Sequence, residues 1–208
     1  VLLGGATGVA PGKVTIVGGG VVGSNACQIA LGLGARVVVL DSSLARLEEL
    51  SRRFGPRLET VYASSANIER HAVDADLLIG AVLVPGRSAD RIISSALVQR
   101  MKPGAVIVDV AIDQGGSCEN SRPTTHAEPT FVVDGVIHYC VANMPGAVPA
   151  TSSQALTNAT LPYVLELAGS GIRQALLANR HLRNGLNVYR GRISSAAVAN
   201  SIGREHAD

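Results

Sequence analysis

The stretch that decides the fold is Lys13-Val14-Thr15-Ile16-Val17-Gly18-Gly19-Gly20-Val21-Val22-Gly23, an apolar β-branched run that leads directly into closely spaced glycines. Such runs are typical of buried strands. Helical periodicity follows over 22–33, so the pattern predicts a strand, a tight turn and a helix in succession. The glycines at 18, 20 and 23 have the G-x-G-x-x-G spacing, which is informative because of this strand-to-helix context.

Each of these glycines has its own expected role in a dinucleotide-binding turn. Gly18 permits the tight turn, Gly20 lets the backbone approach a pyrophosphate, and Gly23 allows the helix to pack closely on the strand. Val21 and Val22 stand between them, where the first helical N–H groups can face the phosphates. The stretch therefore predicts binding of a dinucleotide.

An acidic residue downstream indicates which dinucleotide is bound. The next apolar run ends in Asp41, 18 residues after Gly23, where a carboxylate can accept hydrogen bonds from both adenosine ribose hydroxyls. The carboxylate favours NAD because it repels a 2′-phosphate, whereas Ser42 and Arg46 keep NADP in consideration. The structural alternative is that the glycines only form a tight turn and that Asp41 caps the following helix.

Farther along the chain, apolar runs alternate with helical stretches. This alternation predicts an α/β fold with a doubly wound parallel sheet, because consecutive βαβ units place their strands in parallel. Six strands are expected, at 14–17, 36–40, 58–62, 77–82, 105–110 and 136–141, with helices at 22–33, 43–54, 67–73 and 89–101. A polar loop is expected over 113–130, where glycines and prolines replace a helix.

The pattern changes after Pro149. Helices are expected at 151–168, 172–182 and 194–202, and the last 59 residues contain no long β-branched run. We therefore predict two parts, a nucleotide-binding domain over 1–149 and a helical tail over 150–208.

Composition narrows the class of protein. The chain is 47% hydrophobic and 16% charged with a net charge of +2, which gives no electrostatic footprint for nucleic acid and points to a small-molecule substrate. No apolar run approaches the ~18 residues that span a membrane, and no secretory signal opens the chain, so a cytoplasmic protein is expected. Cys27, Cys118 and Cys140 are widely spaced and predict free thiols, and no metal site is expected.

Residues at the ends of the strands are the remaining candidates, because ligands gather at the carboxyl ends of parallel strands. Asp113 follows the fifth strand and is the candidate acid–base group, with capping of its own loop as the alternative. His126 and His138 are weaker candidates, since the first lies in a polar loop and the second in an alternating strand pattern. No arrangement of a nucleophile with His predicts hydrolysis.

Several longer stretches together resemble one family, the alanine dehydrogenases, through essentially the whole chain to about Leu186. The resemblance rests on 11–13, 18–23, 79–86, 102–104, 108–116, 121–126, 139–145 and 155–160, among them Val108-Asp109-Val110-Ala111-Ile112-Asp113-Gln114-Gly115-Gly116 and Tyr139-Cys140-Val141-Ala142-Asn143-Met144-Pro145. These segments are far more specific than the glycine motif alone.

The resemblance implies reversible, NAD-dependent oxidative deamination of L-alanine to pyruvate and ammonium. It implies that Asp113 matches the active-site aspartate and that further positions contact the dinucleotide, namely Asp41, Arg46, Val82, Leu83, Val110, Asn143 and Met144. Where the family commonly has a serine beside the adenine, this chain has Ala63 followed by Ser64. The family also implies a homo-oligomer, either a hexamer or a dimer.

One departure from the family is large. Members of the family begin with a substrate domain that supplies further catalytic and substrate-binding residues, and this chain has no counterpart of it. We therefore expect the chain alone to bind NAD but to turn over alanine poorly or not at all, because a single carboxylate cannot both orient a substrate and transfer protons. The helical tail is expected to pack on that domain.

Two other interpretations stay open. One is the NAD-binding subunit of proton-translocating transhydrogenase, although those subunits resemble this chain less, since they carry a glutamine where this chain has Asp113 and a long insertion before the fourth strand. The other is a non-catalytic NAD-binding fragment.

Overall fold

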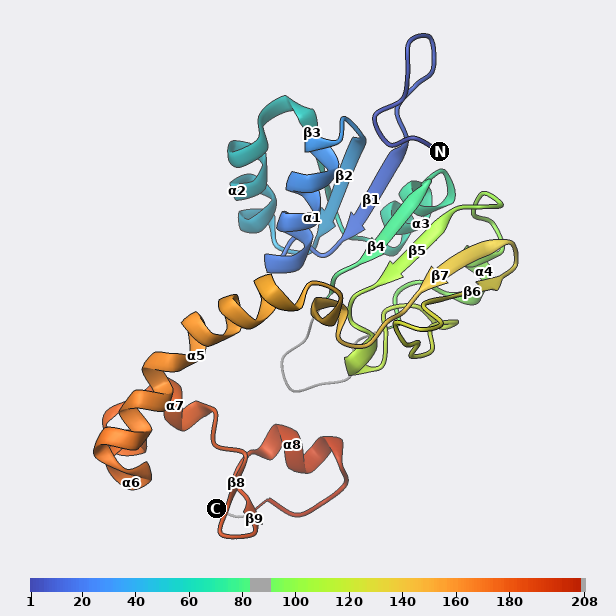
Figure 1. Ribbon diagram of the computed structural model, residues 1–208. Helices are drawn as coiled ribbons and strands as arrows, with labels where there is room; N and C mark the ends of the chain where they lie inside the picture. The colour runs from blue at the N-terminus through green and yellow to red at the C-terminus, as the bar shows by residue number, and fades with distance from the viewer. Residues whose placement is uncertain (83–90, 207–208) are drawn as a thin grey trace. The chain divides into compact units, whose positions relative to one another are not determined.

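The computed structural model describes residues 1–82 and 91–206, and the chain divides into two compact units (Figure 1). The first unit is Val1–Ala142 and the second is Asn143–Asp208. The sequence placed the boundary of its two parts between residues 149 and 150, within the first helix of the second unit. Each unit is described by itself below.

The first unit is built on a seven-stranded sheet in the order β3-β2-β1-β4-β5-β7-β6. All neighbouring strands are parallel except β6 and β7, which form an antiparallel hairpin. The strands are β1 (Lys13–Val17), β2 (Arg36–Asp41), β3 (Leu58–Tyr62), β4 (Leu77–Gly80), β5 (Val106–Asp109), β6 (Thr130–Val133) and β7 (Val136–Tyr139). The predicted doubly wound sheet is confirmed, and the chain reverses direction across the sheet between β1 and β4, which is where such folds bind ligands.

Helices cover both faces of this sheet (Figure 1). The helices are α1 (Val21–Gly32), α2 (Leu44–Phe54), α3 (Ser65–Val73) and α4 (Ser95–Val98). Side chains alternate along β1, so that Val14 and Ile16 pack with α1 and α2 while Val17 packs with α3 and α4. Two hydrophobic cores result, one on each face, as strands buried on both sides require.

Two expectations about this unit were wrong. The predicted helix over 89–101 is largely absent, because in its described part only α4 is helical, and segment 91–94 instead pairs through Ile93 with Cys118. Strand β6 was missed, since Thr130 was taken as the end of a loop. A turn at Asp134-Gly135, both with positive φ, joins β6 to β7, and Gly at the second position is typical of tight hairpins.

The second unit is mainly helical, as expected. It contains α5 (Pro149–Ser170), α6 (Ile172–Ala178), α7 (Arg180–Asn184) and α8 (Ala196–Ser201), and the small hairpin of β8 (Val188–Tyr189) and β9 (Arg192–Ile193), which the sequence did not predict. Across the described residues, every helix is too short or too polar to cross a membrane.

Candidate functional site

The turn between β1 and α1 requires glycine at two positions for different reasons. Gly18 has φ of 101°, and a Cβ on it would lie 2.6 Å from the carbonyl oxygen of Ala81. A Cβ on Gly23 would lie 1.8 Å from the carbonyl oxygen of Gly18. Larger residues would therefore force the turn away from β4 or push α1 off the strand.

Gly20 differs from these two because, in the part of the chain that the structure describes, a Cβ on it would meet nothing within 4 Å. It precedes α1 as the N-cap residue, has φ of −62° and makes no side-chain capping bond. The first helical N–H groups, at Val21 and Val22, have no acceptor inside a helix, and no acidic residue lies in the first turn. This open, amide-rich end of α1 suits an anion such as a pyrophosphate.

A crevice of about 700 Å³ opens beside this turn. Its wall combines the turn with the residues that follow β2, β3 and β4, and it is lined by Val17, Gly18, Gly20, Val21, Val22, Leu40, Asp41, Ser42, Ala63, Ile68, Ala81, Val82 and Ile92. The crevice lies at the carboxyl ends of the strands on both sides of the β1–β4 reversal. Its size and its mostly apolar wall with few polar groups are typical of cofactor sites.

Asp41 lines this crevice, and its carboxylate also orders the backbone around it. Oδ2 accepts a hydrogen bond from the N–H of Gly19 at 2.7 Å, and Oδ1 accepts one from the N–H of Ser43 at 2.8 Å. The capping alternative considered from the sequence is therefore partly present, while Ser43 Oγ is the side-chain cap of α2. Since a carboxylate has about four acceptor sites, Asp41 retains capacity for ribose hydroxyls.

Arg46 contacts the same turn at Gly19. Its Nε donates to the carbonyl oxygen of Gly19 at 2.5 Å, and its guanidinium also pairs with Glu49 at 2.5 Å. This side chain therefore reaches the glycine turn from α2, beside Asp41.

Of the other expected cofactor contacts in the first unit, Val82 lines the crevice, whereas Ser64 and Val110 do not belong to its lining. Ser64 is the N-cap of α3, and its Oγ accepts from Asn67 N–H, while its neighbour Ala63 lines the crevice. Val110 follows β5, and its N–H donates to the carbonyl oxygen of Gly80 at 3.0 Å. Leu83 lies outside the described residues.

Asn143 and Met144 belong to the second unit. Asn143 has φ of 60°, in the left-handed region that Asn tolerates. Met144 begins the short 3-10 helix Met144–Ala147, which immediately precedes α5.

Asp113 lies in the 3-10 turn Ile112–Gln114, directly after the carboxyl end of β5. Its side chain is exposed, and among the described residues no hydrogen bond ties its carboxylate to its own loop. The carboxylate is therefore open to solvent at the ligand-binding edge of the sheet.

His138 is a core residue in this structure. It is fully buried on β7, its ring stacks on Phe131 with centroids 5.0 Å apart, and within the described part of the chain neither ring nitrogen has a hydrogen-bond partner. Burial lowers the pKa of His138, and the nearby carboxylate of Asp109 opposes that shift. The ring is therefore held neutral, which does not suit a group that must exchange protons with a substrate.

This burial predicts a pH-dependent stability. Because the pKa is lowered by folding, the unfolded chain binds the proton more readily, so wild-type stability falls as pH drops below the unfolded value of about 6.5. Burial also lowers the pKa of His71, so replacing His138 with Leu removes only the contribution of His138 to this dependence. The urea midpoint of the variant relative to wild type should therefore increase from pH 7 to pH 5. Replacing the exposed His181 with Leu is the control. Equal pH dependence of the two variants would contradict the prediction.

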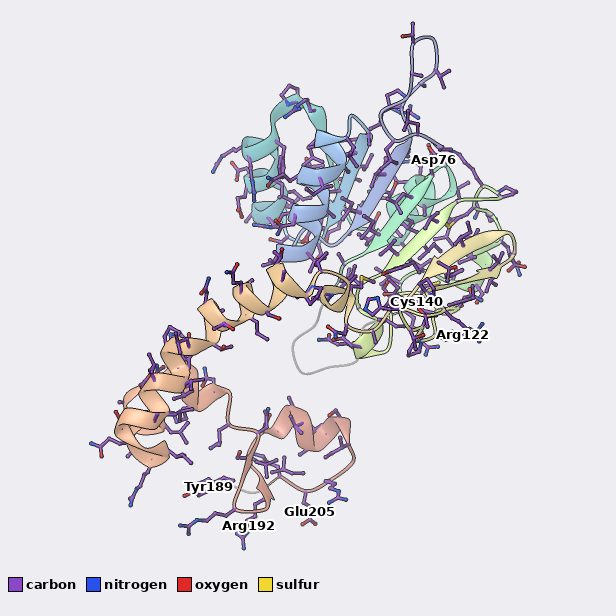
Figure 2. All side chains as sticks on the ribbon, in the orientation of Figure 1. Asp76, Arg122, Cys140, Tyr189, Arg192 and Glu205 are labelled. Carbon is purple, nitrogen blue, oxygen red and sulfur yellow. The ribbon has the colours of Figure 1, made fainter. Side chains whose placement is uncertain are left out.

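The three cysteines are buried and free. Burial raises the pKa of Cys27 and of Cys118 to about 11 and also raises the pKa of Cys140. Cys140 follows β7, at the opposite end of the sheet from Asp76, which precedes β4 (Figure 2). In the described residues no group of three or more His, Cys, Asp or Glu side chains could hold a metal ion.

The sequence reasoning passed over Asp109. This aspartate ends β5 with 0% of its surface exposed and accepts hydrogen bonds from Ser117, Cys118 and Ser121. The available signal was an acidic residue inside an apolar strand, Val108-Asp109-Val110, because an unpaired carboxylate is almost never fully buried.

The fold and the crevice together define the class of protein. A doubly wound sheet, a glycine turn opening on a helix N-terminus that has no side-chain cap, and a carboxylate at the end of β2 make this a dinucleotide-binding domain. Comparison with known proteins identifies the family. The family model described as alanine dehydrogenase/PNT, C-terminal domain, matches residues 1–196. The chain belongs to that family.

Known relatives agree with this assignment. The chain is 56% identical over 208 residues to an alanine dehydrogenase of Halomonas elongata, covering 100% of this chain and 56% of the relative. It is 51% identical over 207 residues to alanine dehydrogenase 2 of Staphylococcus aureus strain USA300, covering 99% of this chain and 56% of the relative. The chain therefore spans little more than half the length of these curated relatives.

Among solved structures, an L-alanine dehydrogenase resembles this chain more than a transhydrogenase does. An L-alanine dehydrogenase has a TM-score of 0.89 at 53% identity, over 98% of this chain and 56% of that one. A transhydrogenase from Sinorhizobium meliloti has a TM-score of 0.62 at 29% identity, over 70% of this chain and 41% of that one. The predicted family is confirmed, and its cofactor is NAD.

The crevice fits that cofactor. Gly20 leaves open the space that a Cβ would occupy, directly before the first amides of α1, which have no acceptor inside the helix. Asp41 stands at the end of the neighbouring strand, where it disfavours a 2′-phosphate.

Proposed function

We propose that this chain is the NAD-binding part of an alanine dehydrogenase, which reversibly oxidises L-alanine to pyruvate and ammonium. The observation that carries the proposal is the conjunction of the open glycine turn with Asp41 in a chain 56% identical to an alanine dehydrogenase along its whole length. Bound NAD would supply the acceptor for the hydride that leaves the substrate Cα. The residues of this chain bind and orient the dinucleotide and assist proton transfer.

The proposed roles follow the geometry of the first unit. The first N–H groups of α1 hold the pyrophosphate, Asp41 holds the adenosine ribose, and Val82 supplies apolar wall. Asp113 assists proton transfer and activates the water that hydrolyses the imine, because it is an exposed carboxylate at the carboxyl end of β5. Leu83, Val110, Ser64, Asn143 and Met144 are proposed as further contacts of the dinucleotide.

We propose that the helical tail packs on a substrate domain, as the family resemblance implies, and that the chain alone binds NAD but turns over alanine poorly. We also propose a cytoplasmic homo-oligomer.

The test compares two proteins. One is the 208-residue chain, and the other is a chimaera in which this chain replaces the matching segment of the Halomonas elongata alanine dehydrogenase. Calorimetric titration should show NAD binding to both, whereas alanine-dependent formation of NADH should appear only in the chimaera. Binding without turnover in the chimaera would favour a non-catalytic NAD-binding protein. Absence of NAD binding from both would refute the proposal.

Cofactor choice gives a further prediction. Replacing Asp41 with Asn removes the charge that repels a 2′-phosphate and weakens the bonds to ribose. A hydrogen bond to a charged group contributes about 1.5–3 kcal/mol, so the ratio of the NADP Kd to the NAD Kd should fall by about tenfold or more. The ratio is measured on one preparation, which cancels any loss of folded protein that follows from weaker bonds to Gly19 and Ser43. An unchanged ratio would contradict the role of Asp41.

The transhydrogenase interpretation is a weaker second candidate. It rests on the 29% identity and TM-score of 0.62 to the transhydrogenase from Sinorhizobium meliloti, against 53% and 0.89 for the L-alanine dehydrogenase. Two results together would favour this candidate. The chain would bind transhydrogenase membrane subunits, and the chimaera would show no alanine-dependent formation of NADH.

A further inference from the structure

We propose that Asp109 is a positioning residue, whose buried carboxylate holds the loop that carries Asp113 in its working geometry. The proposal rests on the proposed function of Asp113, and it assigns to Asp109 no contact with cofactor or substrate. It concerns residues of the first unit only.

The carboxylate of Asp109 accepts four hydrogen bonds from one short segment. Its Oδ2 accepts from Ser117 N–H at 2.8 Å, Cys118 N–H at 3.2 Å and Ser121 Oγ at 2.6 Å. Its Oδ1 accepts from Ser117 Oγ at 2.9 Å. All four donors are neutral, and Asp109 and Ser117 are both 0% exposed. The three bonds from Ser117 and Cys118 are therefore shielded from water, and the bond from Ser121 is partly buried. Hydrogen bonds to a charged group are strongest where water is excluded.

These bonds close a loop around Asp113. Asp109 and Ser117 are eight residues apart, and Asp113 stands midway between them. The chain can fold back because Gly115 and Gly116 have φ of 99° and 81°. A Cβ on Gly116 would lie 3.0 Å from Oδ2 of Asp109, so the glycine lets the backbone pass close to the carboxylate. The position of the turn at Asp113 is thus set from both ends.

The same loop is fixed against the strand beside the crevice. A Cβ on Gly80, at the end of β4, would lie only 2.0 Å from Ser117 Oγ. The carbonyl oxygen of Ser117 accepts from Ile93 N–H at 3.0 Å, and the neighbouring Ile92 lines the crevice. Asp109 therefore sets the position of Asp113 relative to the crevice wall as well as within its own loop.

Removal of the carboxylate should displace the loop. An Ala at position 109 leaves the buried N–H groups of Ser117 and Cys118 without their acceptor, and the segment must rearrange to satisfy them. An Asn keeps an oxygen for the donors on Oδ2 and can donate from its amide to Ser117 Oγ, because a hydroxyl is both donor and acceptor. Asn is therefore the conservative replacement, and Ala is the disruptive one.

The experiment measures Asp109→Ala and Asp109→Asn in the chimaera defined above. Amide hydrogen exchange reports the order of 115–121, calorimetric titration gives the Kd for NAD, and steady-state kinetics per folded molecule give kcat. For Asp109→Ala we expect faster exchange at Ser117 and Cys118 and a kcat about 10²-fold lower, since misplacing a catalytic group by about 1 Å can have that effect. The NAD Kd should stay within about threefold, because the pyrophosphate turn follows β1 and Asp41 ends β2. Val110 stays tied to β4 through the bond from its N–H to the carbonyl oxygen of Gly80.

Rescue by the conservative variant separates positioning from simple stability. Asp109→Asn should restore most of the kcat and the slow exchange. If Asp109→Ala does not fold, Ser121→Ala removes the 2.6 Å bond to Asp109, together with the weak bond that Ser121 Oγ accepts from Cys140 Sγ at 3.7 Å. This variant should lower kcat several-fold in the same direction with the NAD Kd unchanged.

Unchanged exchange at Ser117 and Cys118, or wild-type kcat in a folded Asp109→Ala or Ser121→Ala variant, would overturn the proposal. A parallel rise in NAD Kd and fall in kcat would overturn it too, because that pattern indicates general loosening of the domain. An unsubstituted chimaera that binds no NAD or lacks activity would instead refute the proposed function. Exchange would still decide whether Asp109 orders the loop.

Discussion

Replacing Asp113 with Asn in the chimaera is expected to lower kcat for alanine oxidation by about 10²–10⁴-fold, the usual contribution of a positioned acid–base group. The amide keeps the size of the side chain but cannot accept a proton. Because Asp113 is exposed and, within the described residues, makes no bond that orders its loop, the thermal midpoint should not change. The NAD Kd should also stay near that of the wild type. Initial rates of NADH formation, with titration of NAD, provide the measurement.

A matched control is available in the same unit. Asp134 lies in the turn between β6 and β7 with φ of 50°, a conformation that Asn adopts readily. Asp134→Asn makes the same chemical change just before the amino end of β7, at the opposite edge of the sheet from Asp113, so it should leave kcat unchanged. Similar rates for the Asp113 and Asp134 variants would remove Asp113 from the mechanism.

The second large effect is expected at Gly20. Among the described residues a Cβ there meets nothing within 4 Å, and φ of −62° is ordinary for alanine, so Gly20→Ala should fold as the wild type does. The methyl group would enter the space in front of the α1 amides, where the pyrophosphate is proposed to lie. Overpacking costs about 1–3 kcal/mol, which corresponds to a rise of about 5–150-fold in the NAD Kd.

Gly32→Ala is the control for that variant. It lies at the last position of the same helix, and a Cβ there also meets nothing within 4 Å. Alanine should stabilise the helix end by up to about 1 kcal/mol and leave NAD binding unchanged. Calorimetric titration and thermal denaturation of both variants test the pair. Equal NAD affinity of the two variants would show that the pyrophosphate does not approach Gly20.

The parts of the molecule set by local pattern were predictable from the sequence. The run from Lys13 to Gly23 predicted β1, the turn and α1, because strand periodicity, backbone freedom at glycine and helix periodicity are all properties of neighbouring residues. Asp41 at the end of β2 followed from the same reasoning. The parallel sheet followed from alternation of strands and helices, since parallel neighbours need a crossover between them.

Contacts between distant segments were decided only by the tertiary structure. Segment 91–94 has helical periodicity but pairs with Cys118, because tertiary contacts override a weak local preference. His138 alternated as a strand residue should, yet its complete burial against Phe131 depends on a partner strand that the sequence did not reveal.

Asp109 shows the same division most clearly. The sequence by itself determined that an acid stands at the end of an apolar strand, and it determined the glycines that allow the chain to turn back after it. Only the folded chain decided that Ser117, Cys118 and Ser121 would donate to that acid. Pattern fixes the conformation of neighbours, whereas the partners of a buried charge depend on which segments the whole fold brings together.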